Sequence, residues 1–158
     1  MIKKQPLPTD LIGGKTLKTD ERINFFGEVD ELSALIMEFT HYTEDVKLNM
    51  QLRKIVNILS IALAETAGGM GKVGELHLKE LIELVEEYNQ KAGPFCGFVL
   101  PGETLMGAKA HVLRTVTRRV ERAYASVYEK FGGSEIIFEY LNKLSSLFFA
   151  LARVYDEK

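Results

Sequence analysis

The residues with the clearest capacity for chemistry form a basic stretch, HVLRTVTRRVER, at residues 111–122. On a helix, one face would carry His111, Arg114, Arg118 and Arg122. A second face would carry an apolar stripe of Val112, Val116, Val120, Ala123 and Val127. Arginines spaced i,i+4 on this face repel each other by about 0.2–0.5 kcal/mol per pair in an isolated helix. We therefore expect carboxylates or an anionic ligand to compensate them.

Two interpretations fit these arginines. In the first they form a salt-bridge network, with Asp30 and Glu121 as candidate partners. In the second their planar guanidinium groups bind phosphate oxygens in pairs, which suits a nucleotide. The two can coexist in one helix, with some arginines tied to carboxylates and others free for a ligand.

Two further residues have both a structural and a functional interpretation. Asn142 lies in an otherwise apolar segment, YLNKLSSLFFALAR, where its amide could bond a helix end or fix a sugar or phosphate. Phe98 lies in a loop bounded by Gly and Pro, where it could plug the end of a helical bundle. Alternatively, Phe98 is an apolar wall for a flat ligand.

The sequence offers no convincing metal site or nucleophile. His41, His77 and His111 fall on three different predicted helices without the spacing of metal ligands. The single cysteine, Cys96, excludes an internal disulfide, fits a reducing compartment and is expected to be a small core residue. A GxxxxGK[ST] phosphate loop is also absent.

Composition narrows the class of protein. A chain of 158 residues with 46% hydrophobic residues predicts one domain with a substantial core. The net charge of −2 argues against nucleic-acid binding, which leaves RNA binding through the arginine helix as a weak alternative. No apolar run approaches the roughly 18 residues of a membrane span, so we expect no membrane association and a cytoplasmic location.

Helical periodicity dominates the chain. Residues 1–19 contain Lys, Pro and Gly without periodicity and are interpreted as an arm, whereas residues 20–158 form a single domain. Helices are expected from Asp20 to Phe39 and over about 45–67, 74–92, 103–130 and 134–155. No segment is predicted to be a strand. The expected fold is all-α, an antiparallel five-helix bundle of the ferritin-like up-down type with an extra helix.

Four stretches of the sequence resemble the ATP:cob(I)alamin adenosyltransferases of the propanediol-utilisation type. They are Lys18–Arg22 with GEVDEL at 27–32, FVLPG at 98–102, HVLRTVTRRVER at 111–122 and YLNKLS at 140–145. These stretches occur in the order found in that family. The resemblance implies a homotrimeric five-helix bundle that transfers the 5′-deoxyadenosyl group of ATP to the cobalt of cob(I)alamin and releases triphosphate.

The resemblance also assigns roles to residues. Positions that match ATP-contacting residues of the family are Lys18, Arg118, Arg119, Glu121, Arg122 and Asn142. Asp30 and Arg114 match a pair that forms a salt bridge between subunits beside the site. Phe98 matches the aromatic residue that occupies the lower face of the corrin. The resemblance also implies that Mg²⁺ accompanies ATP, but it assigns no metal ligand to the protein. A reductase and a cobalamin-dependent acceptor enzyme are implied as possible partners.

The N-terminal segment departs from the family. The usual Thr-Gly-Asp-x-Gly-x-Thr loop, which wraps the triphosphate, is replaced by KKQPLPTDLIGG, in which only Thr9, Gly13 and Gly14 offer comparable small or hydroxyl groups. Gly13 is the candidate nucleotide-binding residue of this segment. This departure supports an alternative function, a non-catalytic nucleotide- or corrinoid-binding bundle with a carrier or regulatory role. The intact Arg118, Glu121, Asn142 and Phe98 favour the transferase.

Overall fold

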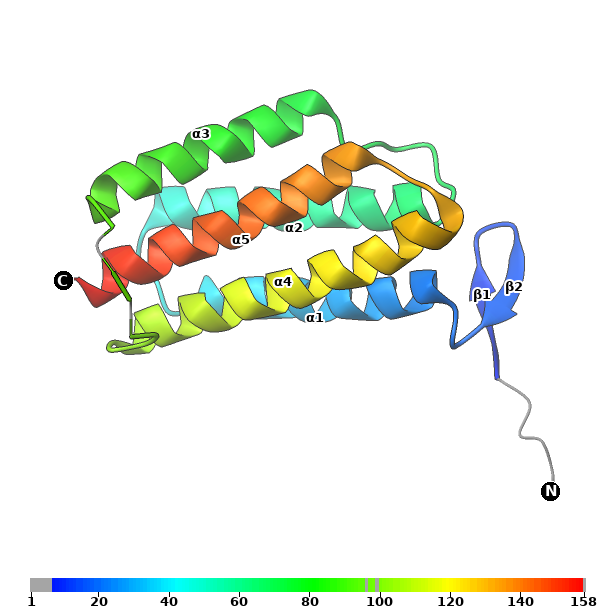
Figure 1. The fold of residues 1–158 in the computed structure, drawn as a ribbon, viewed down its shortest axis with the longest axis horizontal. Helices are drawn as coiled ribbons and strands as arrows, with labels where there is room; N and C mark the ends of the chain where they lie inside the picture. The colour runs from blue at the N-terminus through cyan, green and yellow to red at the C-terminus, as the bar shows by residue number, and fades with distance from the viewer. Residues whose placement is uncertain (1–6, 96, 99, 158) are drawn as a thin grey trace, which may run out of the picture.

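A computed structural model describes residues 7–95, 97–98 and 100–157 of the chain. It contains five long helices and a small hairpin (Figure 1). The helices are α1 (Glu21–Phe39), α2 (Val46–Thr66), α3 (Glu75–Ala92), α4 (Leu105–Phe131) and α5 (Glu135–Asp156). Cys96 lies outside the described residues, and the prediction made for it therefore stays a prediction.

The helices begin where short polar side chains can satisfy free backbone N–H groups. Asp20 accepts a hydrogen bond from the Arg22 N–H, and Asp45 accepts one from the Leu48 N–H. Thr104 and Ser134 perform the same role for α4 and α5. Because these caps can be recognised in the sequence, the predicted starts of the four helices lie within about two residues of the observed starts.

The helices run alternately up and down, with α5 lying between α3 and α4 (Figure 1). Helix α4 packs against α5 and α1, α5 packs also against α3, and α1 packs against α2. The fully buried side chains, including Phe25, Phe39, Tyr124 and Phe148, lie between these helices. The predicted five-helix architecture is confirmed.

The prediction that the chain has no strand was wrong. Strand β1 (Pro8–Leu11) pairs antiparallel with β2 (Gly14–Leu17) through a two-residue turn, in which Gly13 has a φ of +88°. Such a turn needs a residue that tolerates positive φ, which explains why glycine stands there. The strands have four residues each, too few to produce a recognisable alternation of apolar and polar side chains.

The predicted apolar stripe on α4 was displaced at its N-terminal end. His111, expected beside the arginines, is buried, whereas Val112, expected in the core, is 48% exposed. The ring of Phe149 packs 6.2 Å from the His111 ring, and Asp156 approaches it from the end of α5. Near the start of α4, helix α5 therefore covers the face that carries His111. Farther along α4, the same face is exposed and carries the arginines.

Within the described residues, no helix combines the length and the apolar character that crossing a bilayer requires.

Candidate functional site

The arginines of α4 divide into bound and free groups. Arg119 Nε donates to Glu28 Oε2 at 2.5 Å, and its Nη2 contacts Glu31, so this side chain is fastened to α1. These two carboxylates raise the pKa of Arg119 further. Arg118 and Arg122 are exposed and make no ion pair or hydrogen bond with another described side chain. The salt-bridge interpretation is thus confirmed for Arg119, whereas Arg118 and Arg122 remain available for an anionic ligand.

Glu121 and Asn142 border the free arginines. Asn142 Nδ2 donates to Glu121 Oε1 at 3.3 Å, which links α5 to α4. The Asn142 side chain is exposed and bonds this carboxylate rather than the end of a neighbouring helix. Together with Arg118 and Arg122, these residues form what we call the arginine face. It combines two cations, an amide and a carboxylate, and so offers both donors and acceptors to a polar anionic ligand.

Asp30 and Arg114 do not pair with each other within the chain. Asp30 is exposed on α1 and has no ion-pair partner among the described residues. Arg114 Nε instead donates to His111 Nδ1 at 3.2 Å. Each residue keeps a charge that a neighbouring molecule could neutralise.

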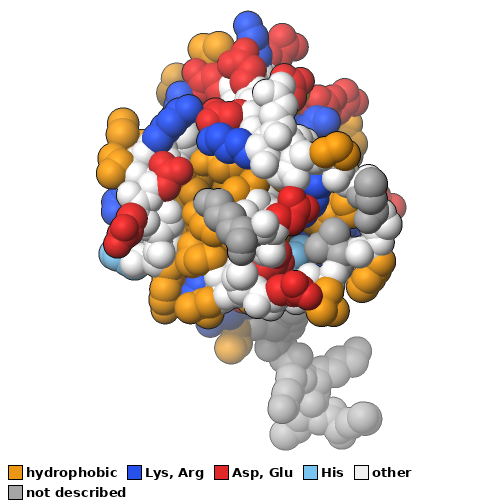
Figure 2. All heavy atoms as spheres, turned by 90° about the vertical axis from the view of Figure 1, so that its left-hand side faces the viewer, with side chains coloured by type: hydrophobic (Ala, Val, Ile, Leu, Met, Phe, Trp, Pro, Cys, Tyr) orange, Lys and Arg blue, Asp and Glu red, His pale blue; other side chains and the backbone are white. Residues whose placement is uncertain are grey.

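Phe98 is not a plug within this chain, because its side chain is 90% exposed. It lies in the connection between α3 and α4, together with Phe95 and Leu100, which are also exposed, and near Leu105 at the start of α4. Figure 2 shows hydrophobic side chains gathered on this end of the bundle. Such an exposed apolar patch typically marks an interaction surface.

The hairpin carries the two remaining candidates. Gly13 forms the turn, and Lys18 is exposed directly after β2. The hairpin is held to α1 by Asp20, which accepts hydrogen bonds from Thr16 Oγ1 at 2.6 Å and from Arg22 Nη2 at 2.7 Å. The bond with the Arg22 guanidinium is the main reason that the pKa of Asp20 lies far below its usual value.

These groups are spread along the bundle rather than gathered. The hairpin lies at one end and the α3–α4 connection at the other (Figure 1). The 27 residues of α4 span about 40 Å, so the arginine face lies about 20 Å along the helix from the end that follows the α3–α4 connection. One chain thus brings together Arg118, Glu121, Arg122 and Asn142, but not Gly13, Lys18 or Phe98.

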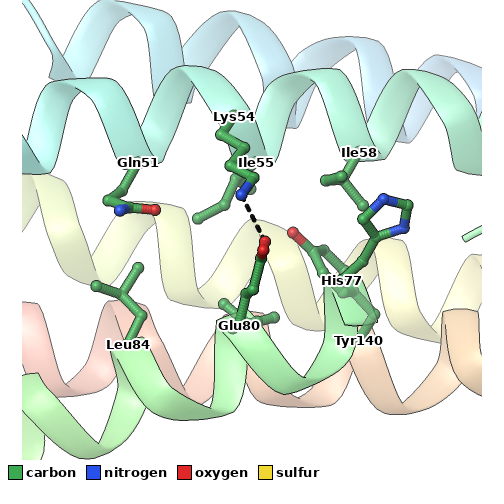
Figure 3. Close-up of a pocket in the computed structure, with 9 residues that line it drawn as sticks. Gln51, Lys54, Ile55, Ile58, His77, Glu80, Leu84 and Tyr140 are labelled. Atoms are coloured by element: carbon green, nitrogen blue, oxygen red, sulfur yellow. Dashed lines mark ion pairs between the residues drawn. The ribbon is translucent and has the colours of Figure 1, made fainter. Parts of the chain in front are cut away.

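A separate pocket between α2 and α3 does not contain any of the predicted site residues (Figure 3). Its rim carries an ion pair of 2.5 Å between Lys54 and Glu80. Its floor includes Tyr140, whose burial raises the pKa of the phenol. Among the described residues, no group of three or more His, Cys, Asp or Glu side chains is arranged to hold a metal ion.

Several functional contacts were missed at the sequence level. The partners of Arg119 are Glu28 and Glu31 rather than the expected Asp30 and Glu121, although their i,i+3 spacing on α1 was a usable signal. The hydrogen bonds of Asp156 to Thr104 were also not predicted. Asp156 lies in the last turn of α5, where the helix dipole disfavours a carboxylate. This unfavourable position was a usable signal that the carboxylate has a specific partner.

Known proteins match almost the whole of this chain in sequence and in fold. Residues 8–155 match a family model described as cobalamin adenosyltransferase. The corrinoid adenosyltransferase of Citrobacter freundii is 31% identical over 94% of this chain and 89% of its own length. The corrinoid adenosyltransferase of Bacillus subtilis is 30% identical over 95% of this chain and 82% of its own length. A variant of the PduO-type ATP:corrinoid adenosyltransferase from Lactobacillus reuteri, complexed with cobalamin and ATP, superposes with a TM-score of 0.87 at 28% identity, covering 95% of this chain and 88% of that one.

Proposed function

Because this chain belongs to the cobalamin adenosyltransferase family and is a corrinoid adenosyltransferase, we propose that its arginine face binds the triphosphate of ATP. The observation that carries this proposal is that Arg118 and Arg122 remain free of carboxylates beside the Glu121–Asn142 pair. Guanidinium groups without a protein partner keep their full capacity for bidentate bonds to phosphate oxygens. Arg119, already bound to two carboxylates, is the least favoured of the predicted ATP contacts.

The reaction requires little acid–base chemistry from the protein. The cobalt of cob(I)alamin is a strong nucleophile; it attacks C5′ of ATP, a cobalt–carbon bond forms, and the C5′–oxygen bond breaks with its electron pair leaving on triphosphate. The protein must align the two substrates, exclude water and stabilise the departing anion. Arg118, Arg122 and Lys18 supply the positive charge for the last task.

The hairpin completes the nucleotide site in this proposal. Gly13 lets the backbone turn approach the phosphates closely, and Lys18 adds an exposed cation after the hairpin. Mg²⁺ would be held mainly by phosphate oxygens and water, as is usual for this ion with nucleotides, since no cluster of protein ligands is present among the described residues.

We place the complete site between subunits of a homotrimer. A single chain keeps the hairpin at one end of the bundle and Phe98 at the other, so a second chain is needed to bring the nucleotide and the corrin surfaces together. The unpaired charges of Asp30 and Arg114 provide an intersubunit ion pair at this boundary.

Phe98 and the surrounding patch receive the corrin in this proposal. An aromatic ring against the lower face of the macrocycle displaces the axial base, which lowers the energy of the orbital that accepts the extra electron. Reduction of Co(II) to Co(I) then comes within reach of a reductase. The same open surface gives a cobalamin-dependent acceptor enzyme access to the product.

The direct test is an anaerobic assay with ATP, Mg²⁺ and chemically reduced cob(I)alamin, following the absorbance change of carbon–cobalt bond formation. Turnover is expected, and would show that the usual Thr-Gly-Asp loop is dispensable in this protein. Measurable binding of ATP or cobalamin without turnover would instead favour the non-catalytic carrier or regulatory bundle.

A further inference from the structure

The connection that carries Phe98 is fastened at its beginning by Arg153. This arginine is 4% exposed, and its Nη2 donates to the carbonyl oxygens of Gly93 at 2.7 Å and Ala92 at 3.3 Å. Its guanidinium also lies 5.4 Å from the centre of the Phe95 ring. Arg153 therefore satisfies the free carbonyl groups at the end of α3 and fixes the point where the connection leaves that helix.

The same connection is fastened at its end by Asp156. Its carboxylate accepts hydrogen bonds from the Thr104 N–H at 2.9 Å, the Thr104 hydroxyl at 3.0 Å and the Gly102 N–H at 3.3 Å. The position of this carboxylate leaves no room for a side chain at residue 107, because a Cβ built on Gly107 would lie 1.8 Å from Asp156 Oδ1. Because Gly107 has no side chain, the Asp156 carboxylate can lie against the backbone of α4.

Both anchors belong to the last turn of α5. Arg153 and Asp156 are three residues apart and thus neighbours on one face of the helix. Figure 1 shows the α3–α4 connection passing across this end of α5. A carboxylate at the C-terminal end of a helix is disfavoured by the helix dipole, so its three hydrogen bonds to the connection must offset that cost.

Among the described residues, none gives Phe98 comparable support. The Phe98 side chain is 90% exposed, so its position depends on the backbone of the connection. That backbone is fixed at Gly93 and again at Gly102 and Thr104, by the two anchors of α5.

We propose that Arg153 and Asp156 are positioning residues for the corrin side of the reaction: they hold both ends of the α3–α4 connection and thereby fix the height of Phe98 against the corrin. This inference rests on the role given to Phe98 in the proposed function. Misplacement of a group by about 1 Å can cost up to about a hundredfold in rate, so loss of one anchor is sufficient to matter.

The first test concerns the anchoring alone. Amide hydrogen exchange at Gly102 and Thr104 is compared in the wild-type protein, Asp156→Ala and Asp156→Asn, without ligands. Exchange should accelerate by at least about tenfold in Asp156→Ala and less in Asp156→Asn, which keeps one acceptor oxygen. Glu139→Gln, on the exposed face of α5, is the matched control. Unchanged exchange in a folded Asp156→Ala would overturn the proposal, whatever the role of Phe98.

The second test concerns the link to Phe98. Electron paramagnetic resonance of ATP-loaded enzyme with cob(II)alamin reports the fraction of four-coordinate cobalt, a signal that a merely structural role would not change. Asp156→Ala should lower this fraction and slow the reaction from Co(II) about tenfold more than the reaction from Co(I). In Phe98→Ala, the added Asp156→Ala should have little further effect on that fraction. Independent losses in the double variant, or equal losses from Co(II) and Co(I), would show that Asp156 does not act through Phe98.

The two tests separate the possible failures. If Phe98→Ala leaves the four-coordinate fraction unchanged while exchange at Gly102 accelerates in Asp156→Ala, the proposed role of Phe98 fails and the anchoring stands. Arg153→Leu should accelerate exchange at Gly93, whose N–H bonds the carbonyls of Asn89 and Gln90 at the end of α3, more than at Thr104, since Arg153 holds that end of the connection. Acceleration confined to Thr104 would contradict the separate roles given to the two anchors.

Discussion

Arg119 of α4 and Glu28 of α1 are joined by an ion pair of 2.5 Å, whereas Arg118, the preceding residue, faces solvent without a carboxylate. Adjacent residues on a helix point in directions about 100° apart, so one arginine reaches α1 and the other projects outward. The same short sequence therefore supplies one arginine that joins two helices and one that we propose to bind the ligand. This division leads to different expectations for substitutions at the two positions.

Arg118→Ala should lower kcat/KM by at least about a hundredfold, because a group that stabilises the departing triphosphate is lost. It should leave the thermal unfolding midpoint nearly unchanged, since the side chain has no partner among the described residues. Arg119→Ala should do the reverse, lowering the midpoint with a smaller loss of activity. Arg53→Ala, an exposed arginine on α2, is the control. Equal loss of activity at positions 118 and 119 would contradict the division.

Phe98→Ala should chiefly impair the reaction that starts from cob(II)alamin, since the aromatic side chain is proposed to displace the axial base. The reaction from chemically reduced cob(I)alamin should retain most of its rate. Parallel anaerobic assays from the two oxidation states measure this difference. Leu100→Ala, also exposed on the same connection, is the control for general loss of apolar surface. Equal impairment from both oxidation states would argue against axial displacement.

The sequence predicts the helices well because their determinants are local. Asp20, Asp45 and Ser134 cap the helices they precede, and glycines end α3 and α4 at the expected places. The hairpin was not foreseen because four-residue strands carry too little pattern. The contacts of Arg153 and Asp156 were not foreseen because they join residues more than 50 positions apart.

The site shows the same limit. The arginine face could be identified from residues on α4, but the choice between bound and free arginines depends on the rotation of α4 against α1. Val112 illustrates the difficulty, since a small error in that rotation placed an exposed side chain in the predicted core. Sequence patterns indicate which residues can do chemistry, whereas packing decides which of them remain available for it.

Asp30 and Arg114 should form an ion pair between subunits. Asp30→Arg and Arg114→Asp should each weaken the proposed trimer, because like charges would then face each other, and the double variant should restore it. Sedimentation velocity over a range of protein concentrations measures the oligomer. Glu129→Arg, an exposed change of charge on α4, is the control. A double variant as weak as the single ones would exclude direct pairing.

Asp20→Ala should lower the free energy of unfolding by about 2 kcal/mol, the upper part of the range for a helix cap, because Asp20 also bonds Thr16 and Arg22. Asp45→Ala is the matched control, since Asp45 caps α2 without an ion pair and should cost about 1 kcal/mol. Urea unfolding measures both. Equal losses would show that the contacts with the hairpin contribute nothing to stability.

His111 should make the protein less stable below neutral pH. Burial, assisted by the charge of Arg114 and only partly opposed by Asp156, lowers the pKa of this imidazole below its ordinary value of about 6.5. The unfolded chain then binds more protons than the folded one between the two pKa values, so the free energy of unfolding falls as the pH drops through that window. Urea unfolding at pH 7.5, 6.5 and 5.5 should show this fall.

The same series separates His111 from the other histidines. His111→Gln should flatten the pH dependence, whereas His41→Gln, at an exposed position, should leave it unchanged. The carboxyls of Asp20 and Asp156 have lowered pKa values, so their contributions to the free energy of unfolding are lost only at more acidic pH. They therefore do not affect the pH dependence in the range where His111 titrates. His111 Nδ1 accepts the Arg114 Nε–H, and protonation would remove this acceptor. If the wild-type and His111→Gln proteins kept the same slope, the neutral state of this imidazole would not contribute to folding.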